Sequence, residues 1–412
     1  MNGAKCTLGV GFIGSGFNAR FHLQAWRGVR DAEVLGVWSP NQKNAASFAA
    51  LARTLDVGQA KAYRSITEMV VDPAIDAIWL TGPNQARVQN VEEIVAAIRG
   101  GAKLKGIACE KPLARNVAEA KHILKLIKSV GIPTGYLENQ LFAPHVEAGR
   151  NLLWARGAAT TGRPYLARAA EEHSGPHMPW FWSGRDQGGG VLNDMMCHSA
   201  LMVRHLLTKP GEALATVKPV RITGHIASLK WSRPAYVKKL KESMRVDYSK
   251  TPSEDFASML IEFETADGLR VIGEATTSWS FVGAGLRLSA ELLGPEYSMK
   301  WNSLDSGLQL FFSREVTGRA GEDLVEKQNA EQGVMPVVPE EYAAYGYTNE
   351  DRHFVRVFLG KEKPLVTWDD GLEVVKLLMA AYQSAEQGKT ISFPPKGLGS
   401  FVPAVAKGTW RP

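Results

Sequence analysis

Cysteine is scarce in this chain: Cys6, Cys109 and Cys197 are the only three in 412 residues. An odd number of widely spaced cysteines excludes a disulfide framework and is typical of a reducing compartment. No uninterrupted apolar run approaches the ~18 residues that a membrane helix needs. The mildly hydrophobic stretch 8–17 is punctuated by glycines, and no small-residue cleavage site follows it. We therefore expect a cytoplasmic protein without a membrane partner.

A strong excess of charge of one sign is also lacking, since 48 basic residues face 42 acidic ones and the net charge is +6. The densest basic stretch, 218–250, contains Lys238, Lys239, Lys241 and Arg245 with Trp231 and Tyr236 between them. Basic residues interleaved with aromatics can line a groove for single-stranded nucleic acid. The alternative, a solvated strand and loop, is favoured because no helix-turn-helix, zinc-finger or RNA-binding signature accompanies the stretch. We expect no nucleic-acid partner.

The hydrophobic fraction of 45% and the charged fraction of 22% are ordinary for a globular protein. A chain of 412 residues exceeds the size at which one core stops growing, so two domains are expected. In the first third, short apolar runs alternate with helical patterns, which favours βαβ units and a parallel sheet. The expected strands are 7–13, 33–38, 77–81, 105–109 and 134–137, and the expected helices are 21–27, 88–99 and 117–130.

After about residue 138 the pattern changes to strands with few helices between them, which predicts a mostly antiparallel sheet. A long helix is expected over 191–207, and the Gly-, Glu- and Pro-rich stretch 313–346 is expected to be a long loop. The expected strands are 220–229, 256–263, 269–277, 286–292 and 308–312, with helices at 350–359 and 371–387. The predicted fold class is α/β, with a Rossmann domain at 1–137 and an α+β domain for substrate binding and oligomerisation at 138–412.

A glycine-rich segment follows the first expected strand. Gly14-Ser15-Gly16-Phe17-Asn18-Ala19 has the G-x-G-x-x-A pattern between a strand and a helix. Gly14 permits the tight turn, Gly16 allows the backbone to approach a pyrophosphate, and Ala19 allows close packing of helix and strand. The helix N-terminus then presents N–H groups to the phosphates. The segment predicts binding of NAD(P)(H).

The end of the second expected strand lacks the acid that usually binds a ribose hydroxyl. Ser39, Pro40 and Asn41 stand there, and Lys43 follows closely. One hypothesis is that the missing negative charge and Lys43 make the site compatible with the 2′-phosphate of NADP. The alternative is that Ser39 and Asn41 contact the ribose of NAD through neutral hydrogen bonds, so the choice of dinucleotide stays open.

Two further segments carry candidate reactive groups. Lys111, in Cys109-Glu110-Lys111-Pro112, follows an expected parallel strand, where it can stabilise negative charge on a substrate oxygen; a surface lysine is the alternative. Asp194 and His198 are four residues apart, so they share one face of the expected helix. Histidine suits proton transfer from an alcohol, so the pair can be catalytic. The alternative is a structural pair, in which Asp194 lies in the first turn of the helix and His198 is part of the core.

A metal site is another hypothesis, because His173 and His177 are four residues apart and Asp194, Cys197 and His198 offer further ligands. Gly175-Pro176 breaks any helix that would align the two histidines, and the spacing lacks a zinc signature. We expect no metal. We expect instead a substrate cleft lined by polar and aromatic side chains, namely His173, His177, Trp180, Trp182 and Arg185.

Taken together, these motifs resemble the glucose–fructose oxidoreductase/inositol dehydrogenase (Gfo/Idh/MocA) family. The similarity rests on the segment 14–19 followed by His22, on Pro83-Asn84, on Glu110-Lys111-Pro112, on Gly188-Gly189-Gly190 through Asp194 and His198, and on the ending 380–388. The motifs occur in family order over nearly the whole chain. The residues then expected to contact the dinucleotide are Gly14, Gly16, Phe17, Asn18, Ser39, Asn41, Lys43, Pro83, Asn84, Glu110 and Lys111.

The resemblance implies that Lys111, Asp194 and His198 converge on the nicotinamide, with His198 as acid/base and the other two orienting the reacting oxygen. It also implies a carbohydrate-like substrate (a sugar, a glycoside or a cyclic polyol) and a homodimer or homotetramer formed through the large sheet. Two alternatives stay open: a sensor that binds the dinucleotide or a sugar without turnover, and a reductase of a non-carbohydrate ligand. Retention of Lys111 and His198 favours the enzyme over the sensor.

Overall fold

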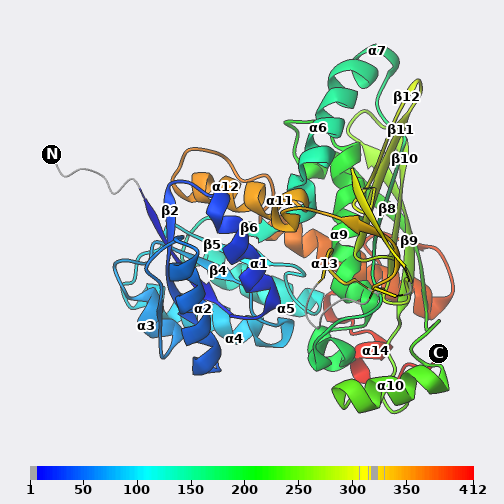
Figure 1. Ribbon diagram of the computed structural model, residues 1–412. Coiled ribbons are helices and arrows are strands. Elements are labelled where there is room, and N and C mark those ends of the chain that lie inside the picture. Colours follow the sequence, from blue (N-terminus) through cyan, green and yellow to red (C-terminus); the bar gives the residue numbers. More distant parts are fainter. Residues whose placement is uncertain (1–6, 306, 314, 317–322, 329) are drawn as a thin grey trace. The chain divides into compact units, whose positions relative to one another are not determined.

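The computed structural model describes residues 7–305, 307–313, 315–316, 323–328 and 330–412 (Figure 1), so Cys6 lies outside the described residues. The chain divides into two compact units. The first unit comprises 1–114, 118–143 and 345–373, and the second comprises 115–117, 144–344 and 374–412. The segment 345–373 therefore belongs to the first unit although it comes late in the sequence. Neither unit is a single contiguous stretch of the chain.

The first unit is built on a six-stranded sheet in the order β3-β2-β1-β4-β5-β6, and every pairing in it is parallel. Every residue of β1, β4 and β5 is buried, as expected for central strands that are covered on both faces. The predicted Rossmann sheet is confirmed. Its strands are β1 (Leu8–Ile13), β2 (Ala32–Trp38), β3 (Lys61–Ala62), β4 (Ala77–Leu80), β5 (Gly106–Glu110) and β6 (Thr134–Leu137).

Helices flank this sheet, and one of them comes from the segment 345–373. The helices are α1 (Phe17–Ala25), α2 (Gln42–Thr54), α3 (Ile66–Val70), α4 (Arg87–Arg99), α5 (Val117–Lys128) and α12 (Tyr347–Phe358). Glycines let α12 approach the strands closely. A Cβ on Gly106 of β5 would fall 2.1 Å from the Phe358 ring, and one on Gly135 of β6 would fall 2.5 Å from the Phe354 ring. The aromatic side of α12 is thus part of the core of the first unit.

The second unit contains a seven-stranded sheet in the order β12-β11-β7-β10-β9-β8-β15. Its pairings are antiparallel except β7 with β10, which confirms the predicted mostly antiparallel sheet. The helix α9 (Val191–Leu207) is buried throughout, and Figure 1 shows it along one face of the sheet. The strands are β7 (Leu166–Glu172), β8 (Val217–Ala227), β9 (Phe256–Thr265), β10 (Arg270–Ser278), β11 (Arg287–Gly294), β12 (Tyr297–Asn302) and β15 (Ile391–Ser392).

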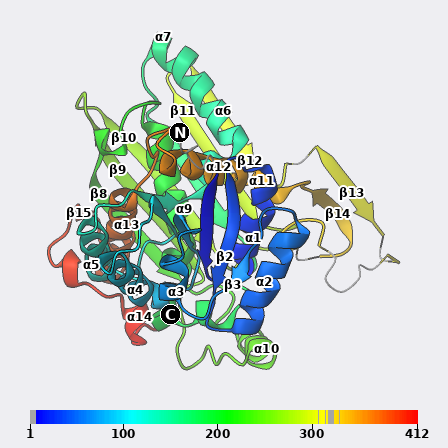
Figure 2. The same ribbon diagram turned by 90° about the vertical axis from the view of Figure 1, so that its left-hand side faces the viewer.

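Two expectations for this part of the chain were wrong. The stretch 313–346 is not simply a loop, because β14 (Gly333–Val337) pairs with β13 (Leu308–Phe312) and α11 (Glu341–Ala344) follows; residues 314, 317–322 and 329 lie outside the description. Figure 2 shows β13 and β14 as a ribbon that stands apart from the large sheet. The basic stretch 218–250 contains a helix, α10 (Pro234–Met244), which starts at a proline and ends at the left-handed Arg245.

The remaining helices are α6 (Pro144–Leu152), α7 (Ala159–Thr161), α8 (Gly184–Gln187), α13 (Trp368–Gln387) and α14 (Ala404–Lys407). A six-residue π-helical segment, Leu153–Ala158, joins α6 to α7. Among the described residues, none of the helices combines the length and apolarity needed to cross a membrane.

Candidate functional site

The turn after β1 has the geometry of a phosphate cradle. Gly14 has φ +115°, and a Cβ there would lie 2.9 Å from the backbone nitrogen of Gly82, so only glycine fits. Gly16 is the N-cap of α1, and a Cβ on it would meet nothing within 4 Å. No described side chain caps this helix end, which leaves its N–H groups open to an anion.

The residues around this turn also fit a dinucleotide. Phe17 is 55% exposed, and Asn18 donates its side-chain N–H to the Tyr347 hydroxyl at 3.4 Å. The side-chain oxygen of Asn18 is buried and has no hydrogen-bond partner among the described residues, so it can accept a hydrogen bond from a ligand. Pro83 and the buried Asn84 follow β4 at the same edge of the parallel sheet. The residues present are therefore compatible with a bound pyrophosphate.

The end of β2 is neutral. Ser39 is buried, and no acidic side chain occupies 39–43. The side-chain oxygen of Asn41 accepts the backbone N–H groups of Lys43 at 3.0 Å and Asn44 at 3.2 Å, so it serves as the N-cap of α2. The side chain of Lys43 is exposed. Of the three polar residues expected here, Asn41 thus has a structural role that engages its oxygen.

Lys111 lies in a turn at the carboxyl end of β5, next to a cis Lys111–Pro112 peptide bond. Its backbone N–H donates to Glu110 Oε2 at 3.0 Å. The buried Arg87 also holds this turn, because its Nη1 donates to the carbonyl oxygens of Glu110, at 2.6 Å, and of Pro112. Sequence reasoning did not find Arg87, which lies at the start of α4 and carries no motif.

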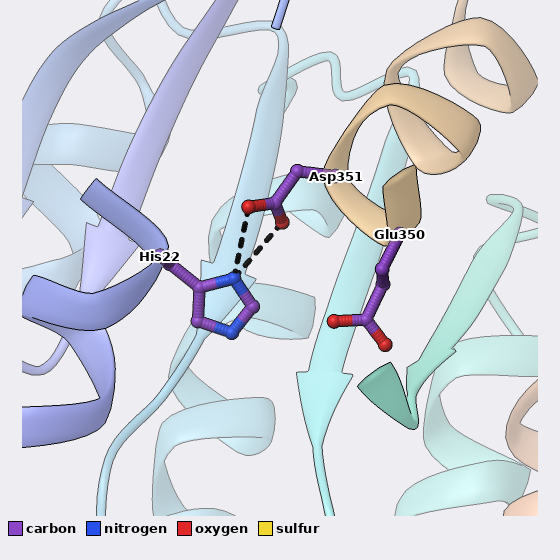
Figure 3. Close-up of side chains that lie close together, drawn as sticks. All are labelled: His22, Glu350 and Asp351. Atoms are coloured by element: carbon purple, nitrogen blue, oxygen red, sulfur yellow. Dashed lines mark hydrogen bonds and ion pairs between the residues drawn. The ribbon is translucent and has the colours of Figure 1, made fainter. Parts of the chain in front are cut away.

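A buried histidine contacts the same glutamate from the other side. His22 Nε2 lies 3.0 Å from Glu110 Oε1, and its Nδ1 lies 2.9 Å and 3.1 Å from the two carboxylate oxygens of Asp351 (Figure 3). Burial is the largest single effect and favours the neutral ring. The carboxylates of Asp351 and Glu110 together outweigh it and raise the pKa of His22 well above its ordinary value. The ring is therefore an imidazolium that donates to both carboxylates.

The ligand atoms of His22, Glu350 and Asp351 lie within 4.8 Å of one another, a grouping that resembles a metal site. A metal would need a lone pair on one ring nitrogen of His22, but both nitrogens face carboxylates. Burial raises the pKa of Glu350 well above its usual range, because a buried carboxyl group is less costly in its neutral form. The geometry supports a buried ion cluster rather than a metal centre.

In the second unit, α9 carries Asp194 and His198, and both are buried. His198 Nε2 lies 3.4 Å from Glu171 Oε2, at the end of β7. Asp194 Oδ2 accepts the indole N–H of Trp279 at 3.3 Å, from the residue that follows β10. Neither Glu171 nor Trp279 carries a sequence signal, because the strand β7 was not predicted and Trp279 follows β10 outside any motif.

The three glycines before α9 allow close contacts at its N-terminus. Glu254 Oε1 accepts the backbone N–H groups of Gly190 at 3.0 Å and Leu192 at 3.1 Å, and the Tyr382 hydroxyl at 2.5 Å. A Cβ on Gly190 would lie 2.5 Å from the Glu254 carbonyl oxygen. Burial raises the pKa of Glu254 to about 7. A buried acid thus caps the helix that carries Asp194 and His198.

The five expected substrate residues have different surroundings. His173 is buried, and its Nδ1 accepts the Gly175 N–H at 2.9 Å. Trp182 is 1% exposed and packs against Trp279, with their ring centroids 5.1 Å apart. His177 and Arg185 are exposed, and the partly exposed Trp180 stacks on Phe181. The structure therefore brings Trp182 to the indole that binds Asp194, whereas no described contact links His177 to that pair.

Two parts of the chain match models of known protein families. Residues 8–134 match the description "Oxidoreductase family, NAD-binding Rossmann fold", GFO_IDH_MocA, and residues 157–299 match the C-terminal domain of the same family. The chain belongs to this oxidoreductase family. The resemblance inferred from the motifs is confirmed.

Individual relatives are distant. The chain is 29% identical over 211 residues to 1,5-anhydro-D-fructose reductase from Ensifer adhaerens, which covers 50% of this chain and only 58% of that protein. It is 24% identical to D-apiose dehydrogenase from Paraburkholderia graminis, with 95% of this chain and 91% of that protein covered. The crystal structure of GenD2 from gentamicin A biosynthesis, in complex with NAD, superposes with a TM-score of 0.75 at 23% identity, covering 94% of this chain and 97% of GenD2. At that identity the superposition supports the fold alone.

Proposed function

We propose that this protein transfers a hydride between a nicotinamide dinucleotide and a hydroxyl or keto carbon of a sugar, a glycoside or a cyclic polyol. The observation that carries the proposal is the pairing of His198, on the buried helix α9, with Glu171, at the end of β7. The chain also has an open dinucleotide cradle at Gly14–Asn18. Family membership supports the reaction type, and the printed activities of the relatives support the substrate class.

The dinucleotide, when bound, supplies the hydride acceptor or donor. The N-terminus of α1 at Gly16, Phe17 and Asn18 would hold its pyrophosphate. Ser39, Asn41 and Lys43 would lie at the ribose, and Pro83, Asn84, Glu110 and Lys111 would lie towards the nicotinamide. Because the end of β2 carries no acid, we propose that both NAD and NADP are accepted.

We propose that His198 removes the hydroxyl proton of the substrate during oxidation. The Glu171 carboxylate, 3.4 Å away, would stabilise the imidazolium that forms. Lys111 would stabilise negative charge on the reacting oxygen, and Asp194, held by the Trp279 indole, would orient a substrate hydroxyl. We further propose that His173, His177, Trp180, Trp182 and Arg185 contribute to substrate binding, and that the chain forms a homodimer or homotetramer.

The test is the absorbance of reduced nicotinamide on purified protein, with NAD and NADP in parallel, against free sugars, inositols and glycosides. Lys111→Ala and His198→Ala should each lower kcat by about 100-fold or more while dinucleotide binding persists. Lys105→Ala is the matched control, because Lys105 precedes β5, is exposed and pairs with Asp76 at 3.0 Å.

Unchanged turnover in both variants would refute the assignment of the catalytic residues. A panel without turnover, together with tight dinucleotide binding, would favour the sensor or a reductase of a non-carbohydrate ligand.

A further inference from the structure

The buried ion cluster of His22, Glu350 and Asp351 contacts the turn that carries Lys111, because His22 binds Glu110. None of the three residues in the cluster takes part in the proposed chemistry. We propose that His22 is a positioning residue for Lys111, which acts by fixing the Glu110 carboxylate that binds the Lys111 backbone. This inference rests on the proposed function, since it assigns to His22 an effect on a lysine that we propose to be catalytic.

The contacts form a continuous path. Asp351 binds Nδ1 of His22, and Nε2 of His22 binds Oε1 of Glu110. The other oxygen of Glu110, Oε2, accepts the backbone N–H of Lys111 at 3.0 Å. The two carboxylate oxygens of Glu110 are thus engaged on opposite sides, so the carboxylate cannot rotate without losing at least one of these bonds.

The far end of the path is itself anchored. Asp351 Oδ1 accepts the indole N–H of Trp79 at 2.9 Å, and Asp351, Trp79 and His22 are all buried. The three residues come from α12, β4 and α1. Three packed elements therefore fix the position of the His22 ring relative to the end of β5. Such rigidity is what a positioned catalytic group needs, because displacements on the order of 1 Å can cost about 100-fold in rate.

The charges in the cluster strengthen the hydrogen bond between His22 and Glu110. His22, as an imidazolium, lies between the carboxylates of Asp351 and Glu110, and charge-assisted hydrogen bonds are roughly twice as strong as neutral ones. The other acids that face this region, Glu138 and Glu350, are buried, and burial holds the pKa of each well above its usual range.

The fold of the turn does not depend on His22 alone. Arg87 binds the backbone carbonyl oxygens of Glu110, Pro112 and Gly82. Removing His22 should therefore loosen the Glu110 carboxylate and the Lys111 amide while the strand and the turn persist. This separation makes a positioning role distinguishable from a structural one.

The first experiment is a double-mutant cycle on the purified protein. His22→Gln and Asp351→Asn should each lower kcat by about tenfold or more, with KM for the dinucleotide changed by less than about threefold. In a Lys111→Ala background the same substitutions should change the residual turnover by less than about twofold, because His22 acts through Lys111. Full additivity of the two effects would overturn the inference.

The matched control is His122→Gln. His122 also pairs with a glutamate in the first unit, at 2.8 Å from Glu92, but that pair is exposed and joins the helices α4 and α5. It should leave kcat unchanged. If Lys111→Ala itself retains full turnover, the proposed function fails; if Lys111→Ala is inactive but His22→Gln and Asp351→Asn are fully active, only the present inference fails.

A second measurement needs no substrate. Backbone hydrogen exchange should accelerate at the Lys111 amide in His22→Gln and in Asp351→Asn, by about fivefold or more, while the amides of β1 and β4 exchange as in the unaltered protein. Unchanged exchange at Lys111, or faster exchange throughout the sheet, would overturn the positioning role. This measurement also decides the case if the Lys111→Ala background is too inactive for the cycle.

Discussion

Ser39 stands at the end of β2, where an acid would exclude the 2′-phosphate of NADP. We expect Ser39→Asp to shift the ratio of kcat/KM for NAD to that for NADP by about tenfold or more towards NAD, because a carboxylate there repels the phosphate. Fluorescence titration with NADH and NADPH would show the same shift in Kd. An NADPH affinity of the unaltered protein far below its NADH affinity would contradict the underlying hypothesis.

Glu171 gives a second prediction at this scale. Its carboxylate lies 3.4 Å from His198 Nε2, so Glu171→Gln removes the negative charge that stabilises a protonated His198. We expect kcat to fall by about tenfold or more, with the acid side of the pH–rate profile displaced to lower pH. Glu242→Gln is the control, because that glutamate pairs with Lys238 on the surface of α10. An unchanged pH profile would exclude the proposed partnership.

Single residues also show what the sequence could and could not predict. Lys111, Asp194 and His198 were found because they lie within short motifs next to predictable elements. Long-range partners could not be found in this way, since Trp279 is 85 positions from Asp194, and Asp351 is 329 positions from the His22 ring that it binds. Such contacts depend on the tertiary fold. The roles of the predicted site residues stay predictions.

At the scale of elements, the helix α9 combines candidate catalytic groups with a titratable cap. Burial raises the pKa of Glu254 from 4.5 to about 7, so the folded protein retains a proton that the unfolded chain releases between these values. The free energy of unfolding should therefore decrease as pH rises from about 4.5 to about 7, by roughly 3 kcal/mol from this group.

Glu254→Gln should remove this contribution, because an amide does not titrate. Thermal melts at pH 5 and pH 8 should give a smaller difference in Tm for the variant than for the unaltered protein. Glu264→Gln is the control, since Glu264 lies on β9 with an exposed ion pair to Arg270. Identical pH dependence of Tm in Glu254→Gln and the unaltered protein would contradict the prediction.

Helices and strands with a clear hydrophobic pattern were predicted well. The helix α9 and the strand β6 have the predicted bounds, and β1, β2, β4 and β5 differ by one residue at one or both ends. The two-residue strand β3 was not predicted. The strand β7 was missed because Leu-Ala-Arg-Ala-Ala-Glu-Glu consists of residues that favour helices. It becomes a strand because β10 and β11 pair with it on either side, which is a tertiary effect.

At the scale of the whole molecule, the large sheet gives a prediction about assembly. One face packs against α9, whereas the other carries the partly exposed Leu260, which is 38% accessible, on the inner strand β9. We expect Leu260→Glu to shift the proposed dimer or tetramer towards smaller species, because Leu260 lies opposite Glu274 of β10 and a second carboxylate there would be buried beside a like charge. Light scattering after size exclusion would measure the mass; an unchanged oligomer would show that this face is not the interface.

The return of 345–373 to the first unit bears on how the protein is made. The ribosome releases β1 to β6 long before α12, and α12 supplies Phe354, Phe358 and Asp351 to the core of that unit. Until α12 emerges, His22 lacks its aspartate and the glycine-lined faces of β5 and β6 lack their cover. Apolar surface of the nascent Rossmann sheet therefore stays uncovered while some two hundred residues of the second unit are synthesised. Because of this order of segments, we expect the chain to depend on chaperones during translation rather than after it.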